Sequence, residues 1–134
     1  MAQFDPEAFL DTAEELLQGL SGAPTVKSNR DQAKVRSSIS RSYYAAYLAA
    51  REAFHSLGRI TPTGGPEDHQ KIINALGGMS TERGGKLHRL RMKRNQADYN
   101  LNPEGFTLVS GKHWASIARE LSQYIIGLNG EAIS

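Results

Sequence analysis

Apolar residues recur every three or four positions along most of the chain, the spacing that places them on one face of an α-helix. Five stretches share this pattern, at about 6–20, 28–57, 66–76, 83–100 and 110–128. Residues rich in Gly and Pro separate them, and no stretch alternates apolar and polar residues for long enough to predict a strand. We therefore predict an all-α protein, a four- to five-helix bundle that forms a single domain over residues 1–134.

The longest stretch, residues 28–57, contains neither Gly nor Pro and so predicts one uninterrupted helix. At 1.5 Å per residue it would extend for about 45 Å, which makes it the expected spine of the bundle. Its middle is rich in Ser and Ala, small side chains that let neighbouring helices approach closely. Tyr43, Tyr44 and Tyr47 point in different directions on this helix, and we expect Tyr47 to fill the core with its hydroxyl at a polar edge.

Pairs of glycine residues set the expected limits of the third and fourth helices. Gly77 and Gly78 follow the apolar pattern of the third helix and are expected to close it. Gly84 and Gly85 are expected to delay the start of the fourth helix, because Gly disfavours helix interiors. Residues 79–85 are therefore predicted to be irregular.

The first and last helices carry boundary signals of a different kind. Asp5 followed by Pro6 predicts a helix start, because Asp accepts a backbone hydrogen bond as an N-cap and Pro has no amide to leave unpaired. Ser110 is the expected cap of the last helix. The run that contains Gly127 and Gly130 is expected to end it.

Composition narrows the class of protein. A chain of 134 residues with 39% hydrophobic and 22% charged residues is typical of one soluble globular domain. It contains no Cys, which excludes disulfides and thiolate chemistry. No basic segment precedes the first apolar positions, and no apolar run approaches the ~18 residues of a membrane span. We expect a cytoplasmic protein with no signal peptide and no membrane contact.

The fourth stretch interrupts its apolar pattern with charge. Leu87 and Leu90 are three residues apart, so both can face the core. The same helix face then continues through Arg91, Arg94 and Asp98. Two guanidinium groups and a carboxylate beside a packed face cost free energy unless they are paired or face a cleft. A functional site is therefore predicted on this helix.

Basic residues are concentrated on the same helix. The net charge of +2 is too small to indicate a nucleic-acid partner by itself. Positions 83–94, however, hold cations and no acid: Arg83, Lys86, Arg89, Arg91, Lys93 and Arg94. Lys86, Arg89, Arg91 and Lys93 are therefore candidate nucleic-acid-binding residues.

No metal site and no cofactor are predicted. His69 stands near the start of the third helix, where a lone His is more often a packing residue or a cap than a ligand. No second His, Cys or cluster of carboxylates stands at metal-ligand spacing to support it.

Two blocks of the chain resemble a known family. SISRSYYAAYLAAREAF in the long helix and LHRLRMKRNQADY in the charged one are similar to the HEPN superfamily, the "higher eukaryotes and prokaryotes nucleotide-binding" helical domains. The likeness is to the small stand-alone prokaryotic branch, with an Ala-Asp-Tyr variant of the motif. DHQKIINAL suits the helix that lies between the two blocks in that family. The resemblance implies a HEPN-like bundle of four or five helices and a homodimer built on the face that carries the motif.

The resemblance also implies a set of site residues. Many HEPN members are metal-independent endoribonucleases whose motif begins with Arg and a polar residue and ends with His. Carried over, Arg94 falls on the motif Arg, Asn95 on the polar position and Tyr99 on the His position. A phenol with a pKa near ~10 is a poor base at neutral pH, so this departure leaves open whether the chain is an enzyme. Asp98 is either a base or the ion-pair partner of Arg94 at i, i+4 spacing.

Three hypotheses follow for the function. The first is an RNA-binding or partner-binding module in a toxin–antitoxin or defence context, with RNA, a nucleotide, a nucleotidyltransferase or an antitoxin as partner. The second is a metal-independent endoribonuclease that acts through Arg94 and Tyr99 at a dimer cleft. The third is a structural domain in which Arg94 and Asp98 form a packing ion pair.

Overall fold

The computed structural model describes residues 3–20 and 28–133, with side-chain surroundings up to residue 128. It contains the helices α1 (Glu7–Leu17), α2 (Asn29–Ser56), α3 (Glu67–Met79), α4 (Thr81–Tyr99) and α5 (Leu108–Ile133). No residue in these ranges belongs to a β-strand. The predicted all-α helical bundle is therefore confirmed.

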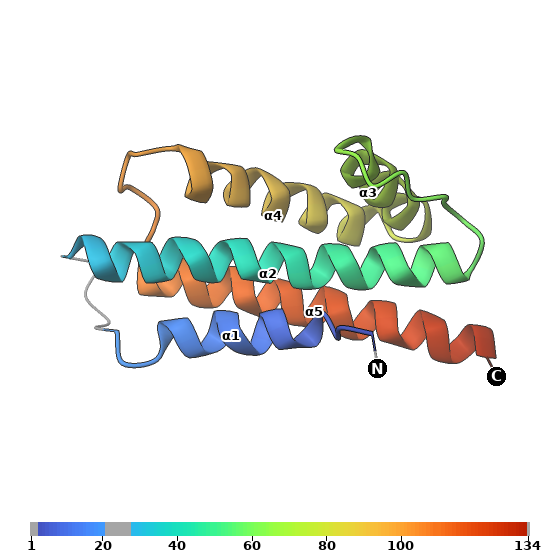
Figure 1. Cartoon of the computed structure of the whole chain (residues 1–134), viewed down its shortest axis with the longest axis horizontal. Coiled ribbons are helices and arrows are strands. Elements are labelled where there is room, and N and C mark those ends of the chain that lie inside the picture. Colours follow the sequence, from blue (N-terminus) through green and yellow to red (C-terminus); the bar gives the residue numbers. More distant parts are fainter. Residues whose placement is uncertain (1–2, 21–27, 134) are drawn as a thin grey trace.

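Helix α2 is the spine of the bundle and contacts each of the other four helices. Figure 1 shows α1 and α4 on opposite sides of α2, with α5 behind it and α3 folded back beside the start of α4. Ser28 caps α2 by accepting a hydrogen bond of 3.0 Å from the backbone N of Asp31. Alanine residues of α2, including Ala45, Ala46 and Ala50, are buried and let α1 and α5 pack closely against it.

The junction of α3 and α4 differs from its prediction. Residues 79–85 are not irregular: α3 continues to Met79, α4 starts at Thr81, and only Ser80 separates them. A Cβ atom added to Gly84 would lie 2.5 Å from the Cα of Gly77, so these two glycines mark a close crossing of α3 and α4. Packing therefore requires glycine at position 84, whereas a Cβ on Gly77 would have its nearest contact at 4.0 Å.

Helix α5 also departs from its predicted limits. It starts at Leu108, and its first turn is capped by Thr107, whose Oγ1 accepts a 3.1 Å hydrogen bond from the backbone N of Ser110. Ser110 is therefore inside the helix and is not its cap. At the other end the helix continues past Gly127 to Ile133, so the prediction that glycine ends it is wrong.

One side chain that no sequence pattern marked, Arg36 of α2, holds the end of α4. Its Nη1 donates a 3.0 Å hydrogen bond to the carbonyl O of Ala97, and its Nη2 donates one of 2.9 Å to that of Asn102. The guanidinium also bonds the carbonyl O of Asn100 and lies 4.1 Å from the ring centre of Phe106. Arg36 thereby provides a donor for the carbonyl of Ala97 in the last turn of α4 and fixes the loop that follows it.

Within residues 3–20 and 28–133, no helix combines the length and the apolar character needed to cross a bilayer.

Candidate functional site

Arg94 lies on the inward face of α4, in line with the core residues of that helix. Leu87 and Leu90 are fully buried and Ala97 is nearly so. Helical spacing puts Arg94 between Leu90 and Ala97 on the same face. Its side chain is only 17% exposed, which is low for a residue that is always charged. The sequence prediction of a charge inserted into the packed face is confirmed for this residue.

The Arg94 guanidinium is held from three directions. Nη2 donates a 2.6 Å hydrogen bond to the hydroxyl of Tyr44, and Nη1 donates one of 2.7 Å to Oδ1 of Asn95. Nε lies 3.0 Å from Oδ2 of Asp98, close enough for an ion pair, although it has no aligned hydrogen-bond acceptor among the described residues. The guanidinium carbon is also 5.0 Å from the ring centre of Tyr44. These contacts restrict Arg94 to one orientation.

Aromatic rings from α2 and α3 pack beside this arginine. The rings of Tyr47 and His69 are stacked, with centres 4.2 Å apart and planes inclined by 10°. The ring of Tyr43 is stacked on the same His69, and the Tyr43 hydroxyl makes a hydrogen bond with its Nδ1. Tyr44 meets His69 edge-on at 6.4 Å. The prediction that Tyr47 fills the core is confirmed.

The surroundings of His69 keep it neutral at pH 7. Burial lowers its pKa from the ordinary value of 6.5, and the charges of Arg91 and Arg94 lower it further. Burial raises the pKa of Tyr43 well above its ordinary value and outweighs the opposite effect of Arg91. Tyr43 therefore stays protonated, and its buried hydroxyl has no other acceptor in the described part of the chain. It donates to Nδ1 of His69, which leaves the imidazole proton on Nε2.

Asp68 fixes the start of α3 and with it the position of His69. Its carboxylate is nearly inaccessible and accepts hydrogen bonds from the backbone N and hydroxyl of Thr63 and from the backbone N of Gly64. The hydrogen bond from the Thr63 amide is the main reason why the pKa of Asp68 is lowered. Asp68 is thus occupied by its own loop, although its charge opposes part of the effect of the arginines on His69.

Arg91 adds a second positive charge beside Arg94, Tyr43 and His69. It lies one helical turn before Arg94 and is half-buried. Its charge acts on both His69 and Tyr43. No carboxylate in residues 3–20 or 28–128 lies within ion-pair distance of it, whereas Arg94 has Asp98. The cluster therefore holds two guanidinium groups against one paired carboxylate.

The other predicted nucleic-acid-binding residues have different surroundings. Lys86 forms an ion pair with Glu82 at 3.2 Å. Nζ of Lys93 lies 4.3 Å from the ring centre of Phe106, and burial lowers its pKa, so it is a packed rather than a fully solvated cation. Arg89 is exposed on the outer side of α4. Of the four, only Arg91 lies beside the aromatic cluster.

The candidate catalytic residues are brought together only in part. Arg94, Asn95 and Asp98 are in contact through the bonds described above. Tyr99 is 77% exposed and makes no contact with the cluster, because helical spacing turns it away from the buried face that Ala97 occupies. His69, which was predicted as a packing residue or cap, is the titratable group that the fold places there. The expectation that Tyr43 and Tyr47 point in different directions is wrong: four residues apart, they share a helix face, and their rings stack with centres 5.7 Å apart. Nothing in the sequence pattern shows which residue of another helix meets them.

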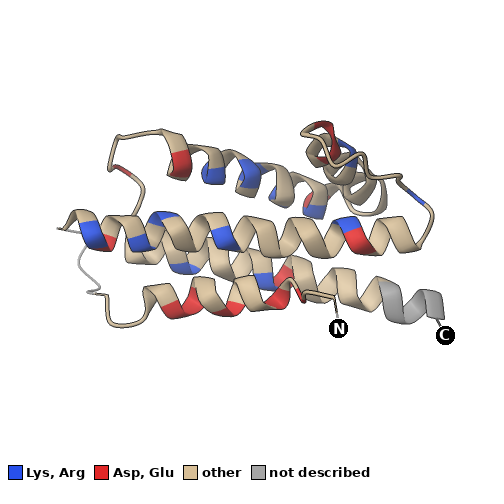
Figure 2. Cartoon of the chain, in the orientation of Figure 1, with Lys and Arg blue, Asp and Glu red and all other residues tan. Residues whose placement is uncertain are grey.

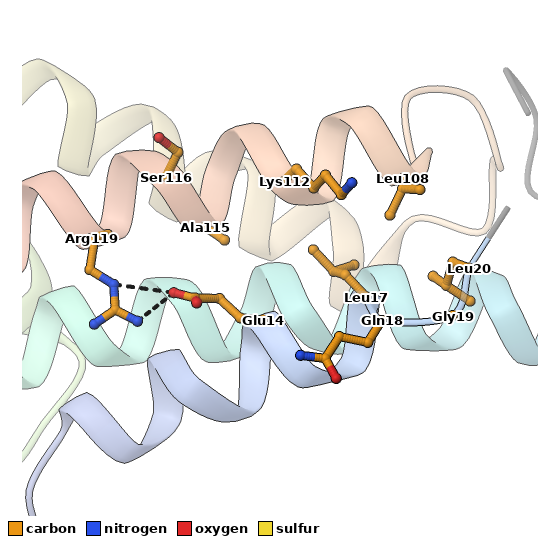
Figure 3. A pocket seen from close by; sticks show the side chains of 10 residues that line it. All are labelled: Glu14, Leu17, Gln18, Gly19, Leu20, Leu108, Lys112, Ala115, Ser116 and Arg119. Atoms are coloured by element: carbon orange, nitrogen blue, oxygen red, sulfur yellow. Dashed lines mark hydrogen bonds and ion pairs between the residues drawn. The ribbon is translucent and has the colours of Figure 1, made fainter. Parts of the chain in front are cut away.

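A cavity lies apart from Arg94 and His69, between the end of α1 and the start of α5 (Figure 3). Its volume is about 610 Å³, and Leu17, Leu20, Leu108 and Ala115 supply much of its apolar wall. Arg119 at its edge donates hydrogen bonds from Nε (3.1 Å) and Nη2 to Glu14, and it forms ion pairs with two further acids of α1. Arg91, Arg94 and His69 do not line this cavity, so the presence of a cavity does not by itself identify the candidate site.

In residues 3–20 and 28–128 no three His, Cys, Asp or Glu side chains are grouped so that they could hold a metal ion.

Comparison with other proteins adds no assignment. No protein-family model, curated protein or solved structure matches this chain.

Proposed function

We propose that this chain binds RNA by contacting its phosphates with the arginine–histidine cluster, defined as Arg91, Arg94, His69 and Tyr44. The observation that carries the proposal is the pair of neighbouring arginines on an inward helix face, opposed by one carboxylate. Guanidinium groups bind phosphate oxygens through two parallel hydrogen bonds, and an arginine held in place loses less freedom when it binds. The resemblance to HEPN domains supports the same partner and a toxin–antitoxin or defence context.

The distribution of charge over the molecule also favours an anionic partner at α4. Figure 2 shows basic residues along α4 and acidic residues along α1, on opposite sides of α2. A polyanion would therefore be attracted to one side of the bundle and repelled from the other, although the net charge is only +2.

A salt-dependent binding experiment tests the proposal. The affinity for a labelled single-stranded RNA is measured by fluorescence anisotropy at several salt concentrations, for the wild type and for Arg91→Ala. Arg41→Ala is the matched control, because Arg41 is an exposed arginine of α2 that lies 5.1 Å from the ring centre of Phe9 on the α1 side. We expect Arg91→Ala to weaken binding about tenfold or more and Arg41→Ala to weaken it less than about twofold. Binding that is absent, or independent of salt, contradicts the proposal.

A second candidate function is a metal-independent endoribonuclease formed by a homodimer, with Arg94 and Tyr99 at the dimer cleft. The observation that favours it is the exposure of two large apolar side chains on one side of α4. Met92 and Tyr99 are seven residues apart and therefore share a helix face, and Leu101 follows them, also exposed. Exposed apolar groups that lie together are typical of an interface, here with a second copy of the chain.

Two measurements test this second candidate. Light scattering at micromolar concentration should give the mass of a dimer, and Met92→Glu should reduce it to that of a monomer. Incubation with mixed RNA in EDTA should produce 2′,3′-cyclic-phosphate ends, and Tyr99→Phe should abolish them as completely as Arg94→Ala. A monomeric wild type, or cleavage that both substitutions leave unchanged, excludes this candidate.

The third reading, a structural domain, gives Arg94 and Asp98 no ligand. Their ion pair is present, and it is compatible with all three functions. The unfolding free energies of the Arg94→Ala and Asp98→Ala variants, taken together with their RNA affinities, separate a packing role from a binding role.

A further inference from the structure

Helix α4 does not offer a row of unpaired cations. Arg83 pairs with Glu120 at 3.0 Å, Lys86 pairs with Glu82, and Lys93 is packed on Phe106. A surface that follows the backbone of a nucleic acid needs several available cations along its length. The exposed Arg89 cannot extend the cluster, because helical spacing places it nearly opposite Arg91 around the axis. This surface is therefore poorly suited to following a strand.

The available hydrogen-bond donors instead belong to one group of neighbouring side chains: the ring centres of Tyr44 and His69 are 6.4 Å apart, and the charge of Arg91 acts on His69. Tyr44 accepts a hydrogen bond from Arg94, so its own O–H is left to donate. His69 receives the Tyr43 hydroxyl at Nδ1, so its Nε2–H is left to donate. Neither of these two donors has an acceptor among the described residues, and Arg91 has none either. The unpaired nitrogen atoms of His69 and Arg91 are accessible to solvent, so an anionic ligand can reach them.

From these available donors we infer that the cluster recognises a terminal phosphate in preference to an internal phosphodiester. A terminal phosphate here means a phosphomonoester, at the end of an RNA or on a free nucleotide. The inference rests on the proposed function and names the part of the RNA that is bound. A terminal phosphate offers three unesterified oxygens, whereas an internal one offers two. Arg91, Tyr44 and His69 supply donors from three separate side chains, which matches the larger number.

The charges of Arg91 and Arg94 also favour a terminal phosphate over an internal one. A phosphomonoester carries about −1.5 to −2 charge at pH 7, and an internal phosphodiester carries one negative charge. Arg91 is without a carboxylate partner in residues 3–20 and 28–128, and Arg94 shares Asp98. Because Coulomb energy is proportional to the ligand charge, two arginines discriminate in favour of the more highly charged group.

The test compares three probes over the same series of salt concentrations. They are an RNA oligonucleotide with a 5′-phosphate, the same oligonucleotide with a 5′-hydroxyl, and the matching nucleoside 5′-monophosphate as a competitor. We expect the phosphorylated oligonucleotide to bind about tenfold more tightly than the hydroxyl form. Competition by the monophosphate at comparable concentration assigns recognition to the phosphate alone. A preference without such competition assigns it to RNA ends.

Two variants connect the preference to the cluster. Arg91→Ala should remove the tenfold difference, while Arg41→Ala should retain it. Tyr44→Phe keeps every cation and the aromatic ring, so it should reduce the preference while the salt dependence of RNA binding stays the same. Circular dichroism melting curves establish that each variant is folded.

The outcomes separate this inference from the proposed function. If both oligonucleotides bind equally and with the same salt dependence, the RNA-binding function stands and the terminal-phosphate inference is overturned. If neither binds, both are overturned. A preference that Arg91→Ala leaves intact also overturns the inference, because it locates the recognition outside the cluster.

Discussion

Tyr44 and Arg94, fifty residues apart in sequence, are joined by a hydrogen bond of 2.6 Å between the Tyr44 hydroxyl and Nη2 of Arg94. The same guanidinium also lies over the Tyr44 ring, with 5.0 Å between its carbon and the ring centre. Helix α2 thus orients the arginine of α4 through both the hydroxyl and the aromatic face of one residue. The two blocks of sequence that resemble the HEPN superfamily meet at this contact.

This contact predicts a measurable coupling energy. Arg94→Ala should destabilise the fold by about 1–3 kcal/mol, because it removes a half-buried charged group and its bonds to Tyr44 and Asn95. Tyr44→Phe should cost about 1 kcal/mol, and the double variant should cost less than the sum by about 0.5–1.5 kcal/mol. Urea unfolding gives the four free energies. Arg89→Ala, an exposed arginine of the same helix, should change stability by less than ~0.5 kcal/mol. Additive effects would show that the two residues are not coupled.

The packing role of Asp98 predicts a smaller effect. Its side chain is 29% exposed and only its charge reaches Arg94, so Asp98→Ala should cost about 0.5 kcal/mol. If Asp98→Ala also strengthens RNA binding, because Arg94 is left with a fuller positive charge, the pair serves a binding site. If it costs as much stability as Arg94→Ala and leaves RNA affinity unchanged, a purely structural pair is the better account.

The titration of His69 predicts a pH dependence of stability. Its pKa in the folded protein is below the ordinary value of 6.5 because of burial, Arg91, Arg94 and, more weakly, Arg51, while the charge of Asp68 opposes part of this effect. The unfolded chain therefore binds more protons than the folded one just below pH 6.5. Stability should be fully present above that pH and should decrease as the pH falls through it. His69→Gln should make unfolding free energies less dependent on pH between about 5 and 7.

Nuclear magnetic resonance measures the same property at the residue itself. The imidazole carbon-bound protons of His69 should titrate below pH 6.5, and Arg91→Ala should raise that pKa because one cation is removed. Arg89→Ala, which removes an exposed arginine from the outer side of the same helix, is the control. A His69 pKa at or above 6.5 would contradict the placement of the two arginines beside it.

The crossing of α3 and α4 predicts opposite effects for two similar substitutions. Gly84→Ala should destabilise the protein by about 1–3 kcal/mol or more, because the added Cβ would lie 2.5 Å from Cα and 2.7 Å from N of Gly77, and neither backbone atom can yield easily. Gly78→Ala places its Cβ in open space within α3 and should stabilise the fold by up to about 1 kcal/mol. Thermal unfolding of the two variants distinguishes them. Equal effects would show that the helices do not cross at Gly84.

Helical periodicity predicted the number and order of the helices because each one buries a single apolar face, and that requirement is local in the sequence. The predicted stretch from about residue 28 agrees with the start of α2 at Asn29, although the Ser28 cap itself was not predicted. The glycine pairs were misinterpreted because close helix packing and helix termination both select Gly. Which one applies at Gly84 depends on the position of Gly77, which is known only once α3 is placed.

For the candidate site, too, the sequence predicted what lies within one helix and missed what depends on contacts between helices. The charge on the inward face of α4 identified Arg94 and Asp98, since both lie within one helix. Tyr99 was assigned to the site by the order of residues in a motif, yet rotation around the helix axis places its side chain outside the cluster. His69 could not be assigned, because its contacts with Tyr43 and Tyr47 join α3 to α2 and leave no periodic signal.

The close approach of Gly77 to Gly84 has a consequence for sequences related to this one. Position 77 is on the helix that starts beside His69, and position 84 is on the helix that carries Arg91 and Arg94. A Cβ at position 84 would lie 2.5 Å from the Cα of Gly77, so a larger side chain there would push the two helices apart and would separate the imidazole from the guanidinium groups, whereas a Cβ at position 77 would have its nearest contact at 4.0 Å. In homologous chains that keep the cluster, position 84 should therefore remain glycine, while position 77 can also be alanine. In chains that have lost His69 or the arginines, that restriction should disappear.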